Sequence, residues 1–365
     1  MNICFVIGTL NYSGAEKIVR YLIEALISSN KISVMLLSCD SKVSNIPSEV
    51  NQYPLYVDPT TFKNPVVRVI KRIQAIRKVV KQNSFDIVVS FGVVFNMDVA
   101  LAMAGLSTKL ILCERNDPVH DPRRAVQRLR RRLTYPLADG YVFQTDTIKS
   151  FFPSKIQKRS TVIPNFIEKT VDAKDKYSPN RKAFATSARL DDNQKDQRTM
   201  IKAFSVFFKK HQDYVLELYG NGPDKELLQN YADVCGVTEN VLFMGRVDNP
   251  MEHIKECKCF MLTSKYEGMP NSLIEAMAHG MPCIATDCSG GGAKALIKNE
   301  KNGILVPVGN VSEIYKAMER IVEDDVFTNS LSFEAYKINT TLEISKIIMM
   351  WSSYFTSVFR GQNAQ

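Results

Sequence analysis

Apolar residues recur along this chain in two alternating patterns. Short unbroken apolar runs, typical of buried parallel strands, alternate with stretches in which apolar residues return every three or four positions, as in amphipathic helices. The first such pair is 3–8 followed by 15–26. Strand, loop and helix in this order form the repeating unit of a doubly wound α/β sheet. The pattern predicts further strands in the first half of the chain at 32–39, 86–91, 109–113 and 140–144.

A second series of the same kind begins at 183. Apolar runs that end in a polar or glycine-containing loop predict strands at 183–190, 216–219, 241–247, 259–263, 282–286 and 303–308. A polar stretch rich in Lys, Asp, Ser and Pro separates the two series and is typical of an inter-domain linker. At 365 residues the chain is long enough for two cores.

The net charge of +9 belongs to the first half of the chain. Residues 1–170 hold 24 Lys and Arg against 13 Asp and Glu, whereas the remaining residues hold 23 against 25. Basic residues line one side of a predicted helix at 66–81, whose other side, from Val66 to Val80, is expected to face the core. Six more fall within ten positions: Arg123, Arg124, Arg128, Arg130, Arg131 and Arg132.

A basic surface of this strength attracts an anionic partner. Each basic residue near an anionic membrane contributes roughly 1 kcal/mol, so the arginine run predicts attachment to a membrane surface without an anchor. Nucleic acid is the competing anionic partner, but the arginines are not accompanied by the aromatic side chains on which bases stack. We therefore expect that the protein does not bind nucleic acid. The apolar runs are far shorter than the roughly 20 residues of a spanning helix. The eight cysteines lack the spacing of a zinc site, which predicts reduced thiols in the core. A strand follows Met1 directly, without the basic segment that opens a signal peptide, and this predicts a cytoplasmic protein.

The most informative stretch is 264–292, SKYEGMPNSLIEAMAHGMPCIATDCSGGG. It predicts a loop, a short helix capped by Asn271 or Ser272 that ends at Gly280, a strand, and a glycine-rich turn. Glu267 lies in the loop and Glu275 within the helix. The N–H groups of a helix start bind phosphate, and carboxylates accept hydrogen bonds from sugar hydroxyls.

This stretch resembles the donor-binding signature of retaining, nucleotide-sugar-dependent glycosyltransferases of family 4, of the bacterial surface-polysaccharide and lipid-linked oligosaccharide type. The likeness extends over nearly the whole chain. It implies the GT-B fold, in which two doubly wound, Rossmann-like α/β domains face a central cleft. The implied parts are an acceptor-binding domain at 1–170, a linker at 171–182, a nucleotide-sugar-binding domain at 183–340 and a C-terminal helix at 341–365 that returns to the first domain.

The resemblance also assigns donor-binding residues. Arg189 and Lys195 match an Arg-x(5)-Lys pair that lies on the donor diphosphate. Two fixed cations stabilise a departing diphosphate without a metal ion, so we expect neither metal nor cofactor. Asp191 and Asp192 are adjacent residues of a loop rather than an Asp-x-Asp metal motif, and we expect both to be solvated. Glu267 is expected at the anomeric carbon or the sugar hydroxyls, and Glu275 at the ribose. The remaining donor positions are Gly14, Gly220, Gly245, Arg246, Gly268, Met269, Pro270, Asn271, Ser289, Gly290 and Gly291.

The acceptor side is expected just after the predicted strand 109–113. Similar Glu-Arg/His-Asn segments line the acceptor side in the family, which makes Glu114, Arg115 and Asn116 candidates, with His120 as a candidate catalytic residue. In an open α/β sheet the carboxyl ends of the strands form the ligand side.

The function implied is transfer of a hexose or N-acetylhexosamine, with retention, from a nucleotide-sugar, expected to be a UDP-sugar, to a hydroxyl of a lipid-linked saccharide. The enzyme would work at the cytoplasmic face of the inner membrane. Two alternatives stay open. One is a sugar-nucleotide epimerase or phosphorylase on the same fold, and the other is a non-catalytic basic protein that binds membranes.

Overall fold

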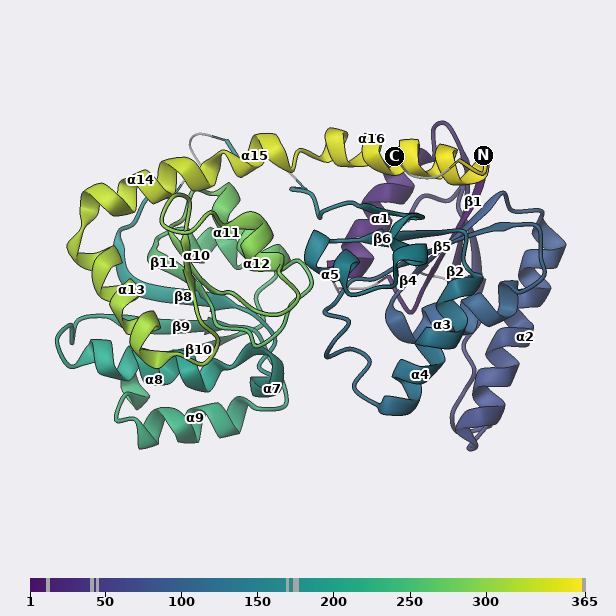
Figure 1. Ribbon diagram of the computed structural model, residues 1–365. Helices are drawn as coiled ribbons and strands as arrows, with labels where there is room; N and C mark the ends of the chain where they lie inside the picture. Colours follow the sequence, from purple (N-terminus) through teal and green to yellow (C-terminus); the bar gives the residue numbers. More distant parts are fainter. Residues whose placement is uncertain (11–13, 40–42, 44–45, 169–170, 173–176, 363–365) are drawn as a thin grey trace. The chain divides into compact units, whose positions relative to one another are not determined.

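The computed structural model describes residues 1–10, 14–39, 43, 46–168, 171–172 and 177–362 and divides the chain into two units (Figure 1). Unit 1 consists of Met1–Asn165 together with Ser345–Gln365, and unit 2 is Phe166–Ile344. Part of the predicted linker, 173–176, lies outside the described residues.

Unit 1 is built on a seven-stranded sheet in which every pairing is parallel. The strand order is β3-β2-β1-β4-β5-β6-β7, so the direction of winding reverses between β1 and β4. The unbroken apolar runs form its buried centre, whereas the short edge strands β3 and β7 were not predicted. The strands are β1 (Asn2–Ile7), β2 (Lys31–Leu36), β3 (Asn51–Pro54), β4 (Ile87–Phe91), β5 (Lys109–Cys113), β6 (Gly140–Phe143) and β7 (Ser160–Val162).

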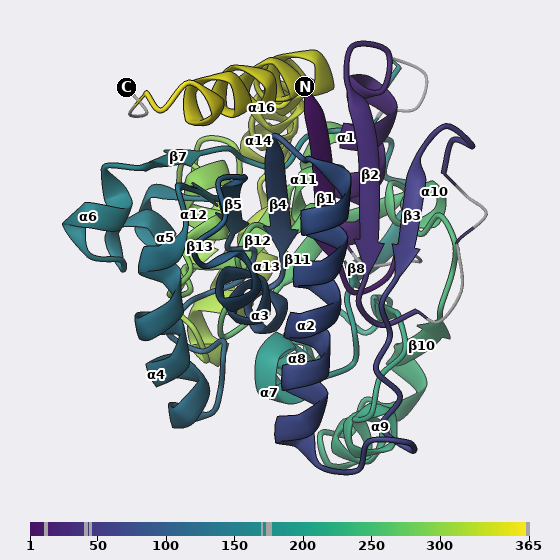
Figure 2. The same cartoon turned by 90° about the vertical axis from the view of Figure 1, so that its right-hand side faces the viewer.

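Helices cover both faces of this sheet. Figure 2 shows α3 between α2 and α4, and both of these helices contact α3. Side chains alternate between the two faces of a strand, so Cys4 and Val6 pack against the α2 and α3 side, while Phe5 points the other way. The helices are α1 (Gly14–Leu26), α2 (Pro65–Asn83), α3 (Val93–Met103), α4 (Ala125–Thr134), η1 (Tyr135–Leu137), α5 (Asp146–Ser150), α6 (Ser154–Gln157) and α16 (Ile344–Phe359).

The C-terminal helix α16 packs on unit 1, as predicted. The ring of Trp351 lies 5.9 Å from that of Phe91, and Phe355 lies 6.4 Å from Phe5. The Tyr354 hydroxyl accepts a hydrogen bond from the backbone N–H of Tyr141 at 2.7 Å. These contacts join residues more than 200 positions apart.

Unit 2 repeats the architecture with a six-stranded sheet, and its pairings are again parallel. The order is β10-β9-β8-β11-β12-β13, so the reversal falls between β8 and β11. Its strands are β8 (Arg181–Ser187), β9 (Val215–Tyr219), β10 (Val241–Gly245), β11 (Cys257–Leu262), β12 (Cys283–Thr286) and β13 (Ile304–Val306).

The core of unit 2 joins the sheet to α8 and α13. Phe184, Leu216 and Met261 from three strands pack with Phe204 of α8 and Met318 of α13. The helices of this unit are α7 (Asp192–Lys195), α8 (Gln197–Phe208), α9 (Lys225–Val234), η3 (Thr238–Asn240), α10 (Met251–Ile254), α11 (Asn271–Ala278), α12 (Gly292–Leu296), α13 (Val311–Glu323), α14 (Asp325–Tyr336) and α15 (Ile338–Thr341).

The eight cysteines are free thiols, as predicted. Six are buried, while Cys39 and Cys235 are partly exposed. Burial raises the pKa of Cys257 to about 11 and raises the pKa of Cys4 still further, which keeps these thiols protonated and unreactive. Within the described part of the chain, every helix is too short or too polar to cross a bilayer.

Candidate active site

The reversal of winding between β8 and β11 brings two loops together at the carboxyl edge of the unit 2 sheet. Ligands of open α/β sheets bind at such a switch point. The segment after β8 and the loop after β11 are joined by a hydrogen bond from the Lys265 backbone N–H to the Gln194 carbonyl at 2.8 Å. The Thr263 hydroxyl donates to the Lys195 carbonyl at 3.0 Å. Lys195 is therefore held beside the loop that carries Glu267.

Lys195 and Glu267 form an ion pair at this point. The Ser264 hydroxyl donates to the same oxygen of Glu267, Oε1, at 2.6 Å, and the Thr286 hydroxyl from β12 donates to the Ser264 carbonyl at 2.5 Å. The side chains of Lys195 and Glu267 are only 18% and 9% exposed. A half-buried ammonium group and a carboxylate with fixed orientation thus lie where a ligand is expected. Ser264 was not singled out from the sequence, because a serine in a loop has no distinguishing spacing.

Glycines let the loops of this edge approach one another at backbone distance. A Cβ added to Gly292 would lie 1.8 Å from the Gly268 carbonyl oxygen. One added to Gly220 would lie 2.0 Å from the Ala188 carbonyl oxygen, and Gly220 has a φ of +135° that favours glycine. Gly245, the last residue of the neighbouring strand β10, accepts a hydrogen bond from the backbone N–H of Gly220 at 2.8 Å. The predicted positions Gly220, Gly245 and Gly268 therefore line the same edge of the sheet.

Helix α11 starts directly after this loop. Pro270 is the residue at its N-cap, and no side chain caps the helix, so the prediction that Asn271 or Ser272 would do so is wrong. Asn271 is instead its first residue, which leaves the first backbone N–H groups of α11 facing the end of the β11 loop. Glu275 lies in the second turn and is partly exposed. Met269 is buried beside the helix start.

Arg189 and Lys195 do not form a pair of equivalent cations. The Arg189 guanidinium forms an ion pair with Asp191, and the Arg189 side chain is 58% exposed, whereas Lys195 pairs with Glu267. Asp191 and Asp192 are buried, so the prediction that they are solvated is wrong. Asp192 accepts a hydrogen bond from Arg198 Nε at 2.6 Å and thereby fixes the start of α8.

The remaining donor candidates lie after strands of the unit 2 sheet and at the start of α1. Arg246 and Ser289 are exposed, while Gly290 and Gly291 are buried in the turn before α12. Gly14 is the first residue of α1, and the residues before it, 11–13, lie outside the described part of the chain.

The acceptor-side candidates of unit 1 follow β5. Glu114 is 1% exposed, and its Oε2 accepts a hydrogen bond from the Tyr135 hydroxyl at 2.8 Å, while its Oε1 has no hydrogen-bond partner among the described residues. Burial raises the pKa of Glu114 to about 8, although the positive charge of Arg131 opposes the rise. Glu114 is therefore mainly protonated and uncharged at neutral pH.

Arg115, Asn116 and His120 lie on the same segment. Arg115 donates from Nη2 to Asn165, and its buried Nε and Nη1 have no acceptor within the described residues. Asn116 Nδ2 donates to Asp121 at 3.2 Å. His120 is exposed, and its Nδ1 lies 2.6 Å from Asp117. Glu114 and Arg115 thus keep buried polar atoms without a hydrogen-bond partner among the described residues, where the unit 1 sheet ends at β5.

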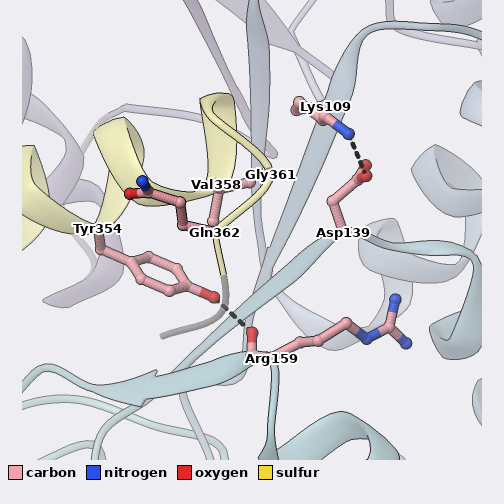
Figure 3. A pocket seen from close by; sticks show the side chains of 7 residues that line it. All are labelled: Lys109, Asp139, Arg159, Tyr354, Val358, Gly361 and Gln362. Carbon is pink, nitrogen blue, oxygen red and sulfur yellow. Dashed lines mark hydrogen bonds and ion pairs between the residues drawn. The ribbon is translucent and has the colours of Figure 1, made fainter. Parts of the chain in front are cut away.

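Two polar clusters lie at the opposite, amino edges of the sheets. In unit 1 a pocket of about 170 Å³ opens beside the C-terminal end of α16, where Lys109 pairs with Asp139 at 3.0 Å and Tyr354 donates to the Arg159 carbonyl at 2.6 Å (Figure 3). Its walls are Lys109, Asp139, Arg159, Tyr354, Val358, Gly361 and Gln362. It is separate from the residues assigned to the acceptor.

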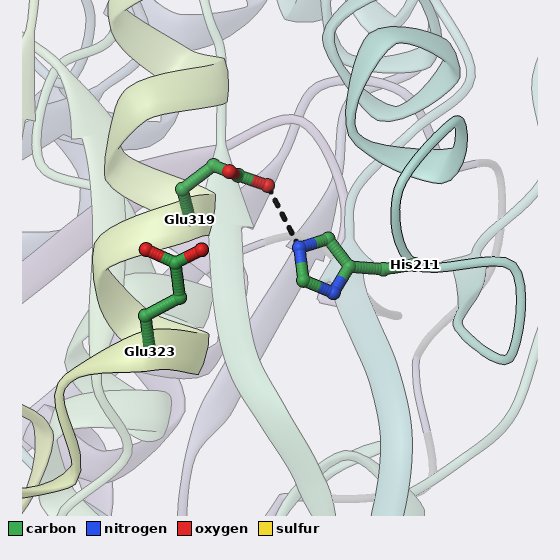
Figure 4. Close-up of side chains that lie close together, drawn as sticks. All are labelled: His211, Glu319 and Glu323. Atoms are coloured by element: carbon green, nitrogen blue, oxygen red, sulfur yellow. Dashed lines mark hydrogen bonds and ion pairs between the residues drawn. The ribbon is translucent and has the colours of Figure 1, made fainter.

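In unit 2, among the described residues, the side chains of His211, Glu319 and Glu323 are spaced closely enough to ligate a metal ion (Figure 4). His211 Nε2 lies 2.8 Å from Glu319, and Lys210 bonds the other carboxylate oxygen at 2.8 Å. Burial acts to raise the pKa of Glu319, but hydrogen bonds from Lys210, Tyr315 and His211 outweigh it and lower the pKa. His211 precedes β9 and lies at the amino edge, so this cluster is separate from the switch point at the carboxyl edge.

The two units, each an α/β sheet with a switch point, define a GT-B type of fold. Solved structures share it over nearly their whole length. The lipopolysaccharide outer core galactosyltransferase WaaB matches with a TM-score of 0.76 and 19% identity over 98% of this chain and 99% of that one. The Anabaena protein HepE in complex with UDP and glucose matches with a TM-score of 0.80 and 17% identity over 98% and 100%.

Sequence comparison supplies the family. Residues 12–170 match the model Glycosyltransferase Family 4, and 168–338 match Glycosyl transferases group 1. An α-1,4-N-acetyl-D-galactosaminyltransferase of Campylobacter jejuni, named for an undecaprenol-diphosphate-linked acceptor, is 26% identical over 98% of this chain and 99% of its own length. An uncharacterized glycosyltransferase of Haemophilus influenzae is 24% identical over 95% and 97%. The chain belongs to glycosyltransferase family 4 and is a glycosyltransferase.

Proposed function

We propose that this enzyme transfers a hexose or N-acetylhexosamine, with retention, from a UDP-sugar to a hydroxyl of a lipid-linked saccharide at the cytoplasmic membrane face. The observation that carries the proposal is the Lys195–Glu267 pair at the unit 2 switch point, beside the start of α11. The name of the Campylobacter relative, which includes a lipid-diphosphate acceptor, supports the acceptor class.

The geometry supports a specific division of work. In the reaction the bond between the anomeric carbon and the diphosphate breaks, a bond from the acceptor oxygen forms on the same face, and the departing phosphate oxygen takes the acceptor's proton. Lys195 stabilises the charge that develops on the diphosphate, and the N–H groups at the start of α11 add to it. Glu267, fixed by Ser264, accepts hydrogen bonds from the sugar hydroxyls. Glu275 holds the ribose.

A thermal-shift screen against UDP-, GDP-, ADP- and TDP-sugars tests the donor. Of the four donors, we expect only a UDP-sugar to raise the melting temperature by several degrees. A ligand at about 100 times its Kd adds about 2.7 kcal/mol to the free energy of unfolding. The sugar found is then supplied with a short prenyl-diphosphate-linked N-acetylhexosamine, and the product's anomeric configuration is read by NMR. Conversion of the donor without acceptor would instead identify an epimerase, and inversion would exclude the retaining mechanism.

The surface proposed to face the membrane includes fewer arginines than the run at 123–132. Arg131 is 4% exposed, so the prediction that it faces the membrane is wrong, whereas Arg130 is partly exposed and forms an ion pair with Asp98. A helix of ten residues exposes one side only, and the arginines of that side share a row at four-residue spacing. The exposed ones are Arg124, Arg128 and Arg132, with Arg123 just before the helix.

Apolar side chains complete this face. Val126, Leu129 and Leu133 on α4 are 68%, 57% and 69% exposed and follow the spacing i, i+3, i+7 of a single stripe. On α2, Val66 and Ile70 are also exposed, so the predicted core-facing stripe of this helix is buried only from Ile76 onward. Asp98 of α3 accepts ion pairs from Arg72 of α2 and Arg130 of α4, which fixes the two helices relative to each other. An exposed apolar stripe beside a basic row is typical of a helix that lies on an anionic membrane.

Flotation with phosphatidylglycerol vesicles tests this face. The variant Arg124/Arg128/Arg132→Glu is expected to bind roughly 100-fold more weakly, since each basic residue contributes about 1 kcal/mol. Wild-type binding should weaken as salt rises, because salt screens exposed charges. Lys298/Lys301/Lys316→Glu, a change of equal charge on exposed residues of unit 2, is the control. Equal binding by both variants would contradict the proposal.

A further inference from the structure

Arg131 is the one residue of the exposed helix α4 whose charged group is directed into unit 1 against a neighbouring loop. Its Nη1 donates to the Asp121 carbonyl at 2.8 Å, and its Nη2 donates to the Pro118 carbonyl at 2.7 Å. The guanidinium plane also lies over two aromatic rings, 5.0 Å from the ring centre of Phe151 and 5.5 Å from that of Phe152. The two hydrogen bonds and the two ring contacts together fix the position of the guanidinium group.

The loop that Arg131 holds carries the acceptor-side candidates. Within the loop, Asp117 accepts hydrogen bonds from the backbone N–H groups of Val119, at 2.9 Å through Oδ1, and of Asp121, at 2.9 Å through its carbonyl. Asp117 also lies 2.6 Å from His120 Nδ1. Asp117 therefore shapes the turn from inside, and Arg131 ties the turn to α4 from outside.

The hydrogen bonds of Arg131 go to the backbone rather than to carboxylates. Both are made to carbonyl oxygens, and within the described residues Arg131 makes no ion pair, so its charge acts on the buried Glu114 only at longer range. Its planar fork instead meets two carbonyl oxygens of one short loop, a geometry that lysine cannot reproduce. A buried cation whose hydrogen bonds go to the backbone of a single loop serves to fix that loop in place.

We infer that Arg131 is a positioning residue, which fixes the loop from Asn116 to Asp121 at the ligand edge of the unit 1 sheet so that the acceptor meets a preformed site. This inference rests on the proposed function for its acceptor. Helix α4 then has two roles, since its outer side forms the proposed membrane face and its buried arginine holds the acceptor loop. A lipid-linked acceptor reaches both from the same membrane.

Hydrogen–deuterium exchange measures the position of the loop without any substrate. In Arg131→Lys we expect the amides of His120 and Asp121 to exchange about tenfold faster, because the loss of two hydrogen bonds from a charged donor makes local opening easier. Arg159→Lys is the matched control. Arg159 likewise donates to a carbonyl, that of Ala138 at 2.7 Å, and lies 5.6 Å over the ring of Tyr141, but at the opposite edge of the sheet. It should leave the loop unchanged.

Kinetics then separate positioning from general destabilisation. With the UDP-sugar that stabilises the wild type and the prenyl-diphosphate-linked N-acetylhexosamine as acceptor, Arg131→Lys should raise the acceptor KM about tenfold. The donor KM and the kcat at saturating acceptor should stay within about twofold of wild type, because unit 2 is untouched. Vesicle flotation should also be unchanged, since Arg131 is buried.

Unchanged exchange at His120 and Asp121 in Arg131→Lys would overturn the inference, as would a donor KM that rises in parallel with the acceptor KM. A wild type that transfers no sugar would refute the proposed function alone, since the exchange experiment still tests whether Arg131 holds the loop. If Arg131→Lys does not fold, Asp117→Asn loosens the same turn from inside without altering α4. It should raise the acceptor KM in the same way, and a normal value would again overturn the inference.

Discussion

Replacing Lys195 with methionine is expected to lower the rate of sugar transfer by about 10²–10³-fold, the usual effect of removing one group that stabilises charge in a transition state. In the proposed mechanism Lys195 supplies the positive charge for the departing diphosphate, and the structure holds this lysine in place through Glu267 and the loop after β11. Methionine keeps the length and apolar stem of lysine but carries no charge. The measurement is kcat and KM with saturating acceptor.

Glu267→Gln should reduce transfer by a similar factor, because it removes the negative charge that pairs with Lys195 and replaces one of the two oxygens proposed to accept hydrogen bonds from the sugar with an amide group that can only donate. The double variant should be little worse than either single one, since groups that act as a unit are not additive. Lys182→Met, which removes an exposed lysine from β8 of the same unit, is the control. A loss of less than tenfold in Lys195→Met would place the charge stabilisation elsewhere.

Gly292→Ala is expected to abolish donor binding and to destabilise unit 2. The new Cβ would lie 1.8 Å from the Gly268 carbonyl oxygen, a backbone atom that no side-chain rotation can move. The loop after β11 and the turn before α12 must separate, which displaces Glu267 and the start of α11. We expect a cost of about 3 kcal/mol, seen as a melting temperature lower by roughly 6–12 °C.

Gly303→Ala is the matched control, because the three atoms nearest to its Cβ belong to the Ile297 side chain, at 3.0–3.2 Å, and need to shift by only a few tenths of an ångström. Its melting temperature and its thermal shift with the UDP-sugar should stay near those of wild type. If Gly292→Ala bound the donor like Gly303→Ala, the close approach of the two loops would have no role in the site.

Local pattern was enough to predict most of the sheet strands. β5 coincides with its predicted range of 109–113, and β1 and β4 begin within a residue of theirs, because a buried parallel strand needs an unbroken apolar run. The edge strands β3 and β7 were missed, since an edge strand is short and partly solvated and has no such run. The loop, helix and strand around Glu267 were also predictable, because glycine and proline mark their ends.

The arginines of α4 show where a local pattern is insufficient. Arg130, Arg131 and Arg132 are consecutive and identical, yet their surroundings differ. Arg130 forms an ion pair with Asp98, Arg131 donates hydrogen bonds to a loop, and Arg132 faces solvent. Each successive residue turns by about 100° around a helix, and only the packing of α4 against α3 decides which direction is inside. The same holds for α2, whose apolar stripe continues past the end of the core.

The amino-acid sequence by itself determined the two series of strand and helix units, the family and the residues at the strand ends, because these depend on apolar periodicity and on motifs of a few dozen positions. Only the tertiary structure decided that Lys195 meets Glu267, 72 positions away, and that Arg189 turns to Asp191. The order of strands in a sheet places loops side by side that are distant in the chain, and that order results from packing of the whole unit.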